Sequence, residues 1–311
     1  MIFLVDFSSK CGIMINKRKV IELEKKFANL HVHSTHSDGA FSPKELVRLA
    51  KEEGYGAVAM TDHDTATGCD ELKEEAAAAG LMSVMGVEFS CTAPELNANF
   101  HMVGFDFDPN EPTMKDFLRY LSEKETYITK LQFDSAMERG TLTHITWDEV
   151  VEANPGLTWF CNEPVFRTLI AKGLKTMLDY PEFFKDFRRP FPTPYQTPTA
   201  KETIANIRRA GGVPILAHGQ HVLDRVPALM SYGLMGLEVS HHMLSESNET
   251  ESANEIAAQY GLYRSGGSDH HGIMGGQQLR YPKGQNPFET KFLEYGVSET
   301  YFMEIYHRTR G

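Results

Sequence analysis

Leu30-His31-Val32-His33 ends the first predicted strand of the chain, which runs over Phe27–His33. Side chains alternate along a strand, so the two histidines face one side and the two aliphatic residues face the other. Two imidazoles on one strand face form a natural chelating pair, and Asp38 adds a carboxylate in the loop that follows. A His-x-His pattern alone is weak evidence for a metal site, so its weight depends on the rest of the chain.

Short apolar runs alternate with amphipathic helical stretches along much of the sequence. After the first run, Ser42-Pro43-Lys44-Glu45 offers an N-cap serine, a proline at the first helical position and a glutamate three residues after the cap. This alternation predicts parallel βα units. The predicted strands are Phe27–His33, Ala57–Met60, Met82–Glu88, Asn99–Phe105, Val213–His218, Met235–Ser240 and Leu262–Gly266.

About seven such strands suit a closed or nearly closed barrel, and an open doubly wound sheet is the alternative. Nearly all the polar side chains of interest lie at or just past the carboxyl end of a predicted strand. In a βα barrel those ends converge on one face, whereas in an open sheet residues from all the strands would not meet at one point. The sequence therefore favours an α/β barrel.

One long segment interrupts this pattern. Between Phe105 and Pro198 no βα repeat occurs, and helices are predicted over Met114–Arg139, Trp147–Ala153 and Glu163–Leu174. The stretch from Tyr180 to Pro198 is interpreted as a tail rich in proline and aromatic residues. We expect residues 107–199 to form an inserted helical cap over the barrel mouth, which divides the barrel into residues 1–106 and 200–311. The alternative is an extra subdomain with no role at the site.

Composition limits the class of protein. The chain has 311 residues, and its formal net charge of −11 argues against a protein that grips long nucleic acid, which usually needs a basic surface. Its four cysteines have no paired spacing, which favours a reducing compartment. The sequence contains neither a signal-peptide pattern nor the roughly 18 consecutive apolar residues of a membrane span. We therefore expect a cytoplasmic protein without a membrane partner.

Histidines and carboxylates lie at or near the ends of most predicted strands. Glu88 closes an apolar run, where an unpaired carboxylate is costly and needs a cation or a basic partner. His, Asp and Glu are the ligand set for transition metals such as Zn, Mn or Fe, so their joint occurrence predicts a multinuclear metal site. The candidate ligands are His31, His33, Asp38, His63, Glu88, His101, His218, Asp269 and His271.

These motifs resemble those of the PHP (polymerase and histidinol phosphatase) phosphoesterases. The matching segments are His31-Val32-His33 with Ser37-Asp38-Gly39, Thr61-Asp62-His63, the single His218, and Ser268-Asp269-His270-His271. The resemblance covers roughly residues 27–105 and 200–272. It implies a distorted parallel (βα)7 barrel with an inserted helical cap, and a centre of three divalent transition-metal ions, Mn, Fe or Zn.

Carried over position by position, the resemblance also implies which residues bind each metal. The first metal would take His31, His33, Glu88 and Asp269. The second would share Glu88 as a bridge and add His101 and His218. The third would take Asp38, His63 and His271.

The long insert makes the chain similar to the stand-alone, nucleotide-directed members of this family. The resemblance implies metal-dependent hydrolysis of a phosphomonoester by a metal-bridging hydroxide, on a small nucleotide such as a 3′,5′-bisphosphate. One departure bears on the substrate, because relatives often carry Arg-Pro-His where this chain reads Glu163-Pro164-Val165. The alternatives are a 5′-3′ exonuclease acting on RNA or DNA ends and a histidinol-phosphatase-like enzyme. A catalytically silent metal-binding module and an amidohydrolase acting on another ester are more distant possibilities.

Residues outside the ligand set are also candidates for the reaction. Asp62 and His241 are candidate catalytic residues in acid or supporting roles, and His270 is a third. Arg167 and Lys172 share one helical stretch and are candidate binders of a second phosphate or a carboxylate on the substrate. Arg188 and Arg189 are further choices for the same role.

Overall fold

The structure is a computed structural model that describes residues 26–187, 190–272 and 295–308. Its strands form two sheets. The first is parallel, in the order β1 (Ala28–Asn29), β2 (Ala57–Val58) and β3 (Met82–Ser83). The second has the order β4 (Gly86–Ala93), β5 (Ala98–Phe105), β6 (Val213–Leu216), β7 (Gly236–Ser240) and β8 (Tyr263–Gly266). The prediction of an α/β fold is confirmed.

The predicted strand over Met82–Glu88 is divided between the two sheets. Its first part is β3 and its last part begins β4, with a break before Gly86. A side chain at Gly86 would come within 2.8 Å of Thr61 Cγ2 and 2.9 Å of Met60 O, so only glycine permits this close turn. An apolar run of seven residues does not reveal such a break, which is why the sequence predicted one strand.

Strand β5 departs from the predicted parallel arrangement, because it runs antiparallel to both β4 and β6. The connection from β4 to β5 consists of the short helix η1 (Pro94–Leu96) and Asn97, which has a left-handed backbone with φ of 49°. A parallel crossover needs about a dozen residues, so a connection this short can only form a hairpin. The reversal brings the N-terminal half of β5 to the end of the sheet where the neighbouring parallel strands finish.

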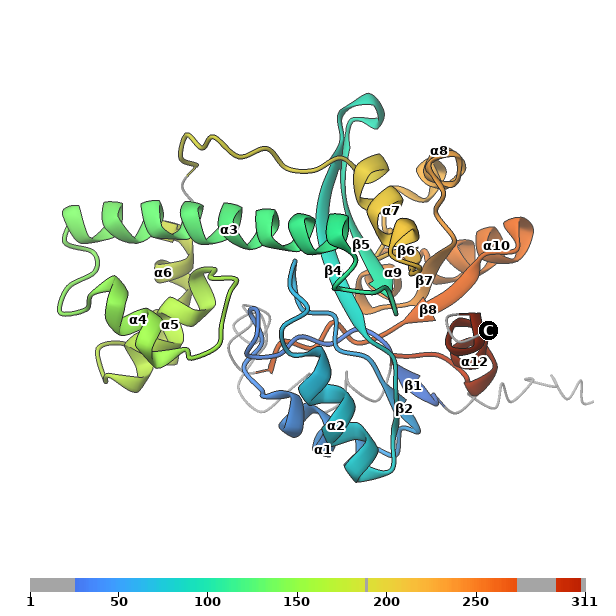
Figure 1. Ribbon diagram of the computed structural model, residues 1–311, viewed down its shortest axis with the longest axis horizontal. Helices are drawn as coiled ribbons and strands as arrows, with labels where there is room; N and C mark the ends of the chain where they lie inside the picture. The colour runs from blue at the N-terminus through green and yellow to red at the C-terminus, as the bar shows by residue number, and fades with distance from the viewer. Residues whose placement is uncertain (1–25, 188–189, 273–294, 309–311) are drawn as a thin grey trace, which may run out of the picture.

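The two sheets lie next to each other (Figure 1). Backbone hydrogen bonds join them at both margins. At one margin Glu88 N donates to Asp62 O at 3.2 Å. At the other, Asp269 N donates to His31 O at 2.8 Å, and a side chain at Gly267 would overlap the His31 backbone. The described strands are therefore two linked sheets, and a single closed parallel barrel is not observed among them.

A shared core fills the space between the sheets. It contains small and branched residues of β1, β2, β5 and β6, and it is closed by Phe302 and Ile305 of helix α12 (Glu299–Arg308). Helices α1 (Pro43–Glu52) and α2 (Cys69–Ala79) cover the outer face of the first sheet. The second sheet is covered by α7 (Ala200–Arg209), α8 (Val226–Tyr232) and α10 (Thr250–Tyr260), and the short helices η3 (Leu223–Arg225) and α9 (His242–Glu246) lie in its connections. The start predicted for the first helix is confirmed, because Ser42 and Glu45 form a capping box.

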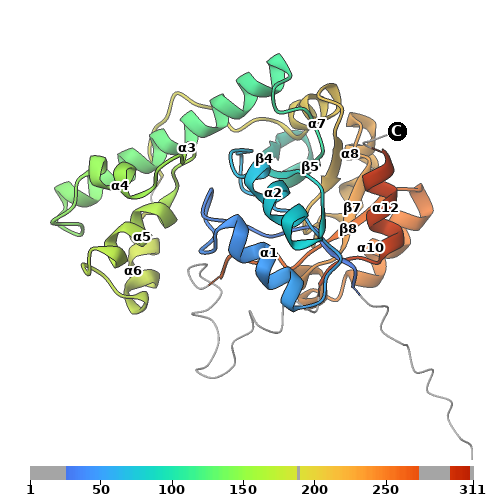
Figure 2. The ribbon, with the colours of Figure 1, turned by 60° about the horizontal axis from the view of Figure 1, so that its bottom comes forward.

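The insert between β5 and α7 is helical. Helix α3 (Pro112–Glu138) begins beside the second sheet and extends away from it (Figures 1 and 2). Helices α4 (Trp147–Ala153), α5 (Asn162–Ala171) and α6 (Tyr180–Phe187) and the short η2 (Met177–Asp179) pack on its far half around a separate apolar core. The three predicted helices are confirmed. The interpretation of residues 180–187 as part of a tail was wrong, because Pro181 is tolerated in a first helical turn.

The helical insert thus has its own core, while the first half of α3 packs with the second sheet through Met114 and Leu121. In the described ranges, no helix has both the length and the apolar character that a bilayer crossing requires.

Candidate metal centre

The first group of candidate ligands lies at the bottom of the site and is buried. Glu88 Oε2 lies 3.2 Å from His31 Nε2 and 3.2 Å from His33 Nε2. Asp269 Oδ1 lies 3.1 Å from His33 Nε2. The two ring nitrogens of the histidine pair are themselves 3.1 Å apart. Four side chains from three separate segments therefore direct their ligand atoms at one small volume.

The second group uses the other oxygen of Glu88. Glu88 Oε1 lies 2.8 Å from His101 Nδ1 and 2.9 Å from His218 Nε2. These two ring nitrogens are 3.2 Å apart. His101 reaches this position because β5 is reversed, and His218 follows β6 with an unusual φ of 25°. The Glu88 carboxylate therefore faces the first group with one oxygen and the second group with the other.

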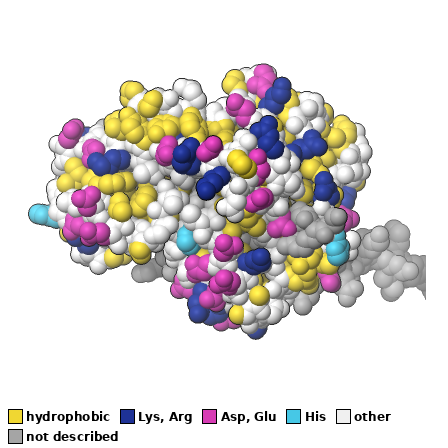
Figure 3. Space-filling view, in the orientation of Figure 1, with side chains coloured by type: hydrophobic (Ala, Val, Ile, Leu, Met, Phe, Trp, Pro, Cys, Tyr) yellow, Lys and Arg dark blue, Asp and Glu magenta, His cyan; other side chains and the backbone are white. Residues whose placement is uncertain are grey.

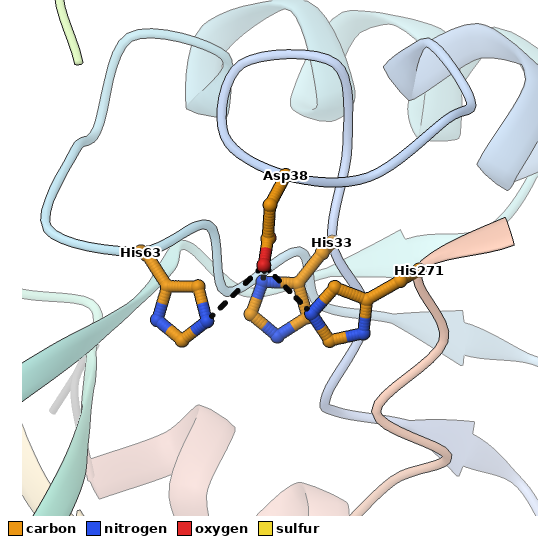
Figure 4. Close-up of side chains that lie close together, drawn as sticks. All are labelled: His33, Asp38, His63 and His271. Atoms are coloured by element: carbon orange, nitrogen blue, oxygen red, sulfur yellow. Dashed lines mark ion pairs between the residues drawn. The ribbon is translucent and has the colours of Figure 1, made fainter. Parts of the chain in front are cut away.

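The third group surrounds Asp38, as Figure 4 shows. Asp38 Oδ2 lies 3.2 Å from His271 Nε2 and 3.7 Å from His63 Nε2. Asp38 Oδ1 lies 3.5 Å from His33 Nδ1. The sequence did not assign His33 to this group. Its ring turns one nitrogen to the first group and the other nitrogen to the third.

All nine candidate ligands therefore lie in one connected cluster. The first group is almost fully buried, whereas the histidines of the second and third groups are partly exposed, with His101 at 36%. The cluster is thus closed on the core side and accessible on the outer side. The backbone of Asp269 is also unusual, because its φ is positive at 55°. Left-handed non-glycine residues of this kind concentrate at functional sites.

The hydrogen bonds of the first group suit a cation. His31 Nδ1 donates to Glu238 Oε1 at 2.7 Å, so Nε2 is the ring nitrogen that would bind a metal ion after losing its proton. That nitrogen points at His33 Nε2 and at the Glu88 carboxylate, and such a convergence of ligand atoms is the arrangement of a metal site. The donor set of imidazoles and carboxylates suits Mn, Fe or Zn.

Without a cation, protons compensate part of the negative charge of the cluster. Burial opposes protonation of His31, but the charges of Glu238 and Glu88 outweigh it and raise the pKa of His31 well above its usual range. Burial disfavours ionisation of Glu88, but the charges of His31 and His101 outweigh it and hold the pKa of Glu88 well below its usual range. A bound cation would displace these protons, because ionised carboxylates and neutral imidazoles are the forms that bind metal ions.

Glu238 belongs to the site although the sequence reasoning missed it. Its side chain is fully buried on β7, and besides His31 it binds the backbone N–H of His218, which donates to Oε2 at 2.7 Å. The sequence pattern that singled out Glu88, a carboxylate within an apolar strand, also occurs at Glu238. Glu238 holds one residue from each of two groups and so fixes their relative positions.

The two candidate catalytic residues lie behind the ligands. Asp62 accepts hydrogen bonds from Ser34 N at 2.7 Å, from Ser34 Oγ at 2.6 Å and from Ser37 Oγ at 2.5 Å. Both its oxygens are therefore engaged by the loop that carries Asp38. His241 is fully buried, accepts from Met243 N at 3.1 Å and lies 3.5 Å from Asp269 Oδ2. These placements favour supporting roles over direct contact with a substrate.

His270, Arg167 and Lys172 each contact a different part of the structure. His270 is buried and stacks on Phe41 with ring centroids 5.5 Å apart. Arg167 donates to the carbonyl oxygens of Gly39 and Thr35, so it ties α5 to the loop that carries Asp38. Lys172 forms an ion pair with Glu149 of α4. Arg188 and Arg189 lie outside the described residues.

The part of the helical insert that borders the cluster is the segment that leads into α5. Trp159 stacks on His63 with ring centroids 5.9 Å apart, and its indole is buried. Glu163 accepts hydrogen bonds from Tyr180 Oη at 2.6 Å and from Cys161 Sγ at 3.0 Å. Burial, followed by the charge of Asp38, raises the pKa of Glu163. The position where relatives often carry arginine is thus a buried carboxyl group in this chain.

Comparison with known proteins places these features in a family context. Residues 29–163 match the model of the PHP domain. The 5′-3′ exoribonuclease Rnm of Salmonella typhimurium is 32% identical over 258 residues, which are 78% of this chain and 84% of the relative. The 3′,5′-nucleoside bisphosphate phosphatase of Chromobacterium violaceum is 27% identical over 261 residues, with 78% of this chain and 86% of the relative covered.

The fold is also similar to that of solved structures. A structure from Bifidobacterium adolescentis, described as that of a metal-dependent phosphoesterase, superposes with a TM-score of 0.72 at 27% identity. The similarity covers 91% of this chain and 96% of the other. It therefore includes the helical insert as well as both sheets.

Proposed function

Because the chain belongs to the PHP family and is a metal-dependent phosphoesterase, we propose that it hydrolyses a phosphomonoester on a small nucleotide, such as a 3′,5′-bisphosphate. The observation that carries the proposal is the position of the helical insert at the candidate metal centre. Trp159 stacks on His63 and Arg167 binds the loop that carries Asp38. A centre bordered in this way suits a short substrate better than a long chain.

Three divalent ions, Mn, Fe or Zn, are the proposed occupants of the three groups. When bound, such ions acidify a water molecule and neutralise charge on the phosphoryl oxygens. The nine side chains of the cluster would hold them, and Glu88 directs one oxygen toward each of two groups. Glu238 orients His31 and His218, and Asp62 orients the loop between His33 and Asp38. These residues fix the geometry of the centre before a substrate enters.

The proposal includes the architecture around the centre. The hydrogen bonds that join the two sheets at both margins support a distorted form of the (βα)7 barrel, in which β5 is reversed. The separate core of α3–α6 supports residues 107–199 as a cap on that barrel. In this arrangement the ligands come from the barrel, and the substrate is selected by the cap.

Exonuclease activity is the second candidate, and one observation favours it: the Salmonella relative at 32% identity is named as a 5′-3′ exoribonuclease. The face of the molecule seen in Figure 3 favours the smaller substrate. Lys and Arg side chains are interspersed with Asp and Glu on the face seen in Figure 3, and they form no continuous basic path there. A protein that follows a nucleic acid strand uses a positively charged groove with stacking aromatics.

The test compares rates across substrate length. Protein loaded with Mn²⁺ is assayed for phosphate or nucleotide release from a nucleoside 3′,5′-bisphosphate, from 5′-phosphorylated oligoribonucleotides of increasing length, and from histidinol phosphate. We expect the bisphosphate to have the highest kcat/KM, and the Glu88→Gln variant to lose activity on every substrate. A kcat/KM that rises with oligonucleotide length supports the exonuclease instead, and a preference for histidinol phosphate rejects both nucleotide proposals.

A further inference from the structure

Lys124 on α3 is a largely buried lysine whose ammonium group pairs with no residue in the described part of the chain. Its side chain is only 9% exposed, and it makes no hydrogen bond or ion pair with any residue in the described ranges. The other two lysines of the helix behave ordinarily. Lys115 is exposed, and Lys130 forms an ion pair with Asp134 at 2.6 Å. Nζ of Lys124 is not fully enclosed, so the ammonium group at the end of this packed side chain is open to an anion that enters the site.

The position of Lys124 is next to the candidate metal centre. One turn before it, Leu121 packs with the second sheet, so this part of α3 lies against the barrel. Two residues after it, Thr126 Oγ1 accepts from Phe160 N at 3.1 Å, which attaches α3 to the segment that carries Trp159. Trp159 in turn stacks on His63. Lys124 therefore lies where the barrel, α3 and the segment bordering the third ligand group meet.

No carboxylate in the described part of the chain pairs directly with Lys124. The ammonium acts electrostatically on Asp64 and Glu125, yet neither carboxylate lies within 4.0 Å of it. Asp64 instead accepts a hydrogen bond from Ser90 N at 3.0 Å. A second donor nearby is also unsatisfied, because the buried Trp159 Nε1 has no hydrogen-bond partner. The buried Trp159 Nε1 and the accessible ammonium group of Lys124 are thus two donors that no acceptor in the described ranges satisfies, and an external group could bind both.

We propose that Lys124 binds a second phosphate group of the substrate, the one that is not hydrolysed. This inference rests on the proposed function and specifies how its substrate is selected. The two cations predicted for that role are engaged elsewhere, since Arg167 binds backbone carbonyls and Lys172 pairs with Glu149. A second phosphate one ribose away from the scissile ester exists in a nucleoside 3′,5′-bisphosphate and also at the 5′ end of an RNA chain.

The experiment measures a ratio of specificities. For the Mn²⁺-loaded protein, kcat/KM is determined for a nucleoside 3′,5′-bisphosphate, for a 5′-phosphorylated dinucleotide, and for p-nitrophenyl phosphate, which has a single phosphate. The Lys124→Met variant keeps the length of the side chain and loses its charge. We expect the ratio of nucleotide to p-nitrophenyl phosphate to fall by about tenfold to a hundredfold, because a charge-assisted hydrogen bond is lost. Lys124→Arg retains the charge and should recover most of the ratio.

Lys115→Met is the matched control, because it removes an exposed lysine from the same helix. The expected result is a ratio within about twofold of the wild type. If the bisphosphate ratio falls, the small nucleotide is the source of the second phosphate, and if only the dinucleotide ratio falls, an RNA end is. An unchanged ratio in Lys124→Met overturns the inference while the proposed function stands. A wild-type protein that cleaves p-nitrophenyl phosphate but neither nucleotide overturns both.

Calorimetry gives a readout that does not depend on turnover. A nucleoside 5′-monophosphate, which carries the phosphate assigned to Lys124, is titrated into the wild type and into each variant, and the dissociation constant is compared. Weaker binding by about tenfold in Lys124→Met, with Lys115→Met unchanged, supports the inference. Equal binding by all three proteins contradicts it.

Discussion

Glu238 and His31 form a buried hydrogen bond of 2.7 Å between residues that are 207 positions apart in the chain. The Glu238 carboxylate accepts from Nδ1 of His31 with one oxygen and from the backbone N–H of His218 with the other. A carboxylate that orients a ligating imidazole fixes its tautomer and raises its basicity. The candidate metal centre is therefore held in shape by a residue outside the nine candidate ligands.

Replacing Glu238 with glutamine should weaken metal binding. The amide can accept one of the two hydrogen bonds, but its NH2 group then faces a second donor. We expect the affinity for Mn²⁺ to fall by about tenfold to a hundredfold in Glu238→Gln, as is typical for residues that support a metal ligand. Titration calorimetry on metal-free protein measures this. Glu255→Gln, an exposed change on α10, is the control and should bind Mn²⁺ as the wild type does.

Metal loading should stabilise the folded protein, because the ions bind ligands that the unfolded chain does not bring together. At a metal concentration of about 100 times Kd, the expected gain in the free energy of unfolding is about 2.7 kcal/mol per site. Thermal unfolding with a chelator and with Mn²⁺ measures the difference in Tm. His33→Ala, which removes a ring shared by two groups, should lose most of this Mn²⁺-dependent shift. His307→Ala on α12 should keep it, and an equal shift in both variants would contradict the assignment.

Arg167 should matter for the position of the loop that carries Asp38. Its planar guanidinium donates to the carbonyl oxygens of both Thr35 and Gly39, a geometry that a lysine ammonium does not reproduce. In Arg167→Lys we expect kcat/KM for the preferred phosphoester to fall by about tenfold, and the metal content of the purified protein to decrease. Arg119→Lys, which changes an exposed arginine of α3, serves as the comparison and should stay within about twofold. Wild-type metal content and rate in Arg167→Lys would show that the loop does not need this contact.

Glu163 should make the metal-free protein less stable as the pH rises. Burial, followed by the charge of Asp38, raises its folded-state pKa above the unfolded value of 4.5, so the folded protein holds the proton more tightly. The free energy of unfolding therefore decreases as the pH rises from 4.5 through the folded pKa, and the penalty is absent below 4.5. The Glu163→Gln variant lacks this pH-dependent penalty. The free energy of unfolding of the variant relative to that of the wild type should therefore grow between pH 5 and pH 8.

Urea unfolding in the presence of a chelator at several pH values measures that difference. Glu182→Gln on α6 is the control, because Glu182 is exposed. Its stability relative to the wild type should not change with pH. A flat profile for Glu163→Gln, or one that slopes the other way, would rule out a buried carboxyl group with a raised pKa at this position.

The identity and order of the candidate ligands were readable from the sequence. Two local rules were sufficient: side chains alternate along a strand, and the ends of neighbouring strands lie close together. They selected His31 and His33 as a pair and singled out Glu88 as a carboxylate in an apolar run. The α/β class and three helices of the insert followed from periodicity and caps in the same way.

Tertiary structure alone decided the details that position the site. The division of one predicted strand at Gly86 and the reversal of β5 depend on how the two sheets meet, and no local pattern specifies that contact. The partner of Arg167 is Gly39, 128 positions earlier, so its role was not accessible from the helix that carries it. Residue types limit which interactions a side chain can make, but long-range packing selects the partner, and for Glu238 and Arg167 the partner determines the role.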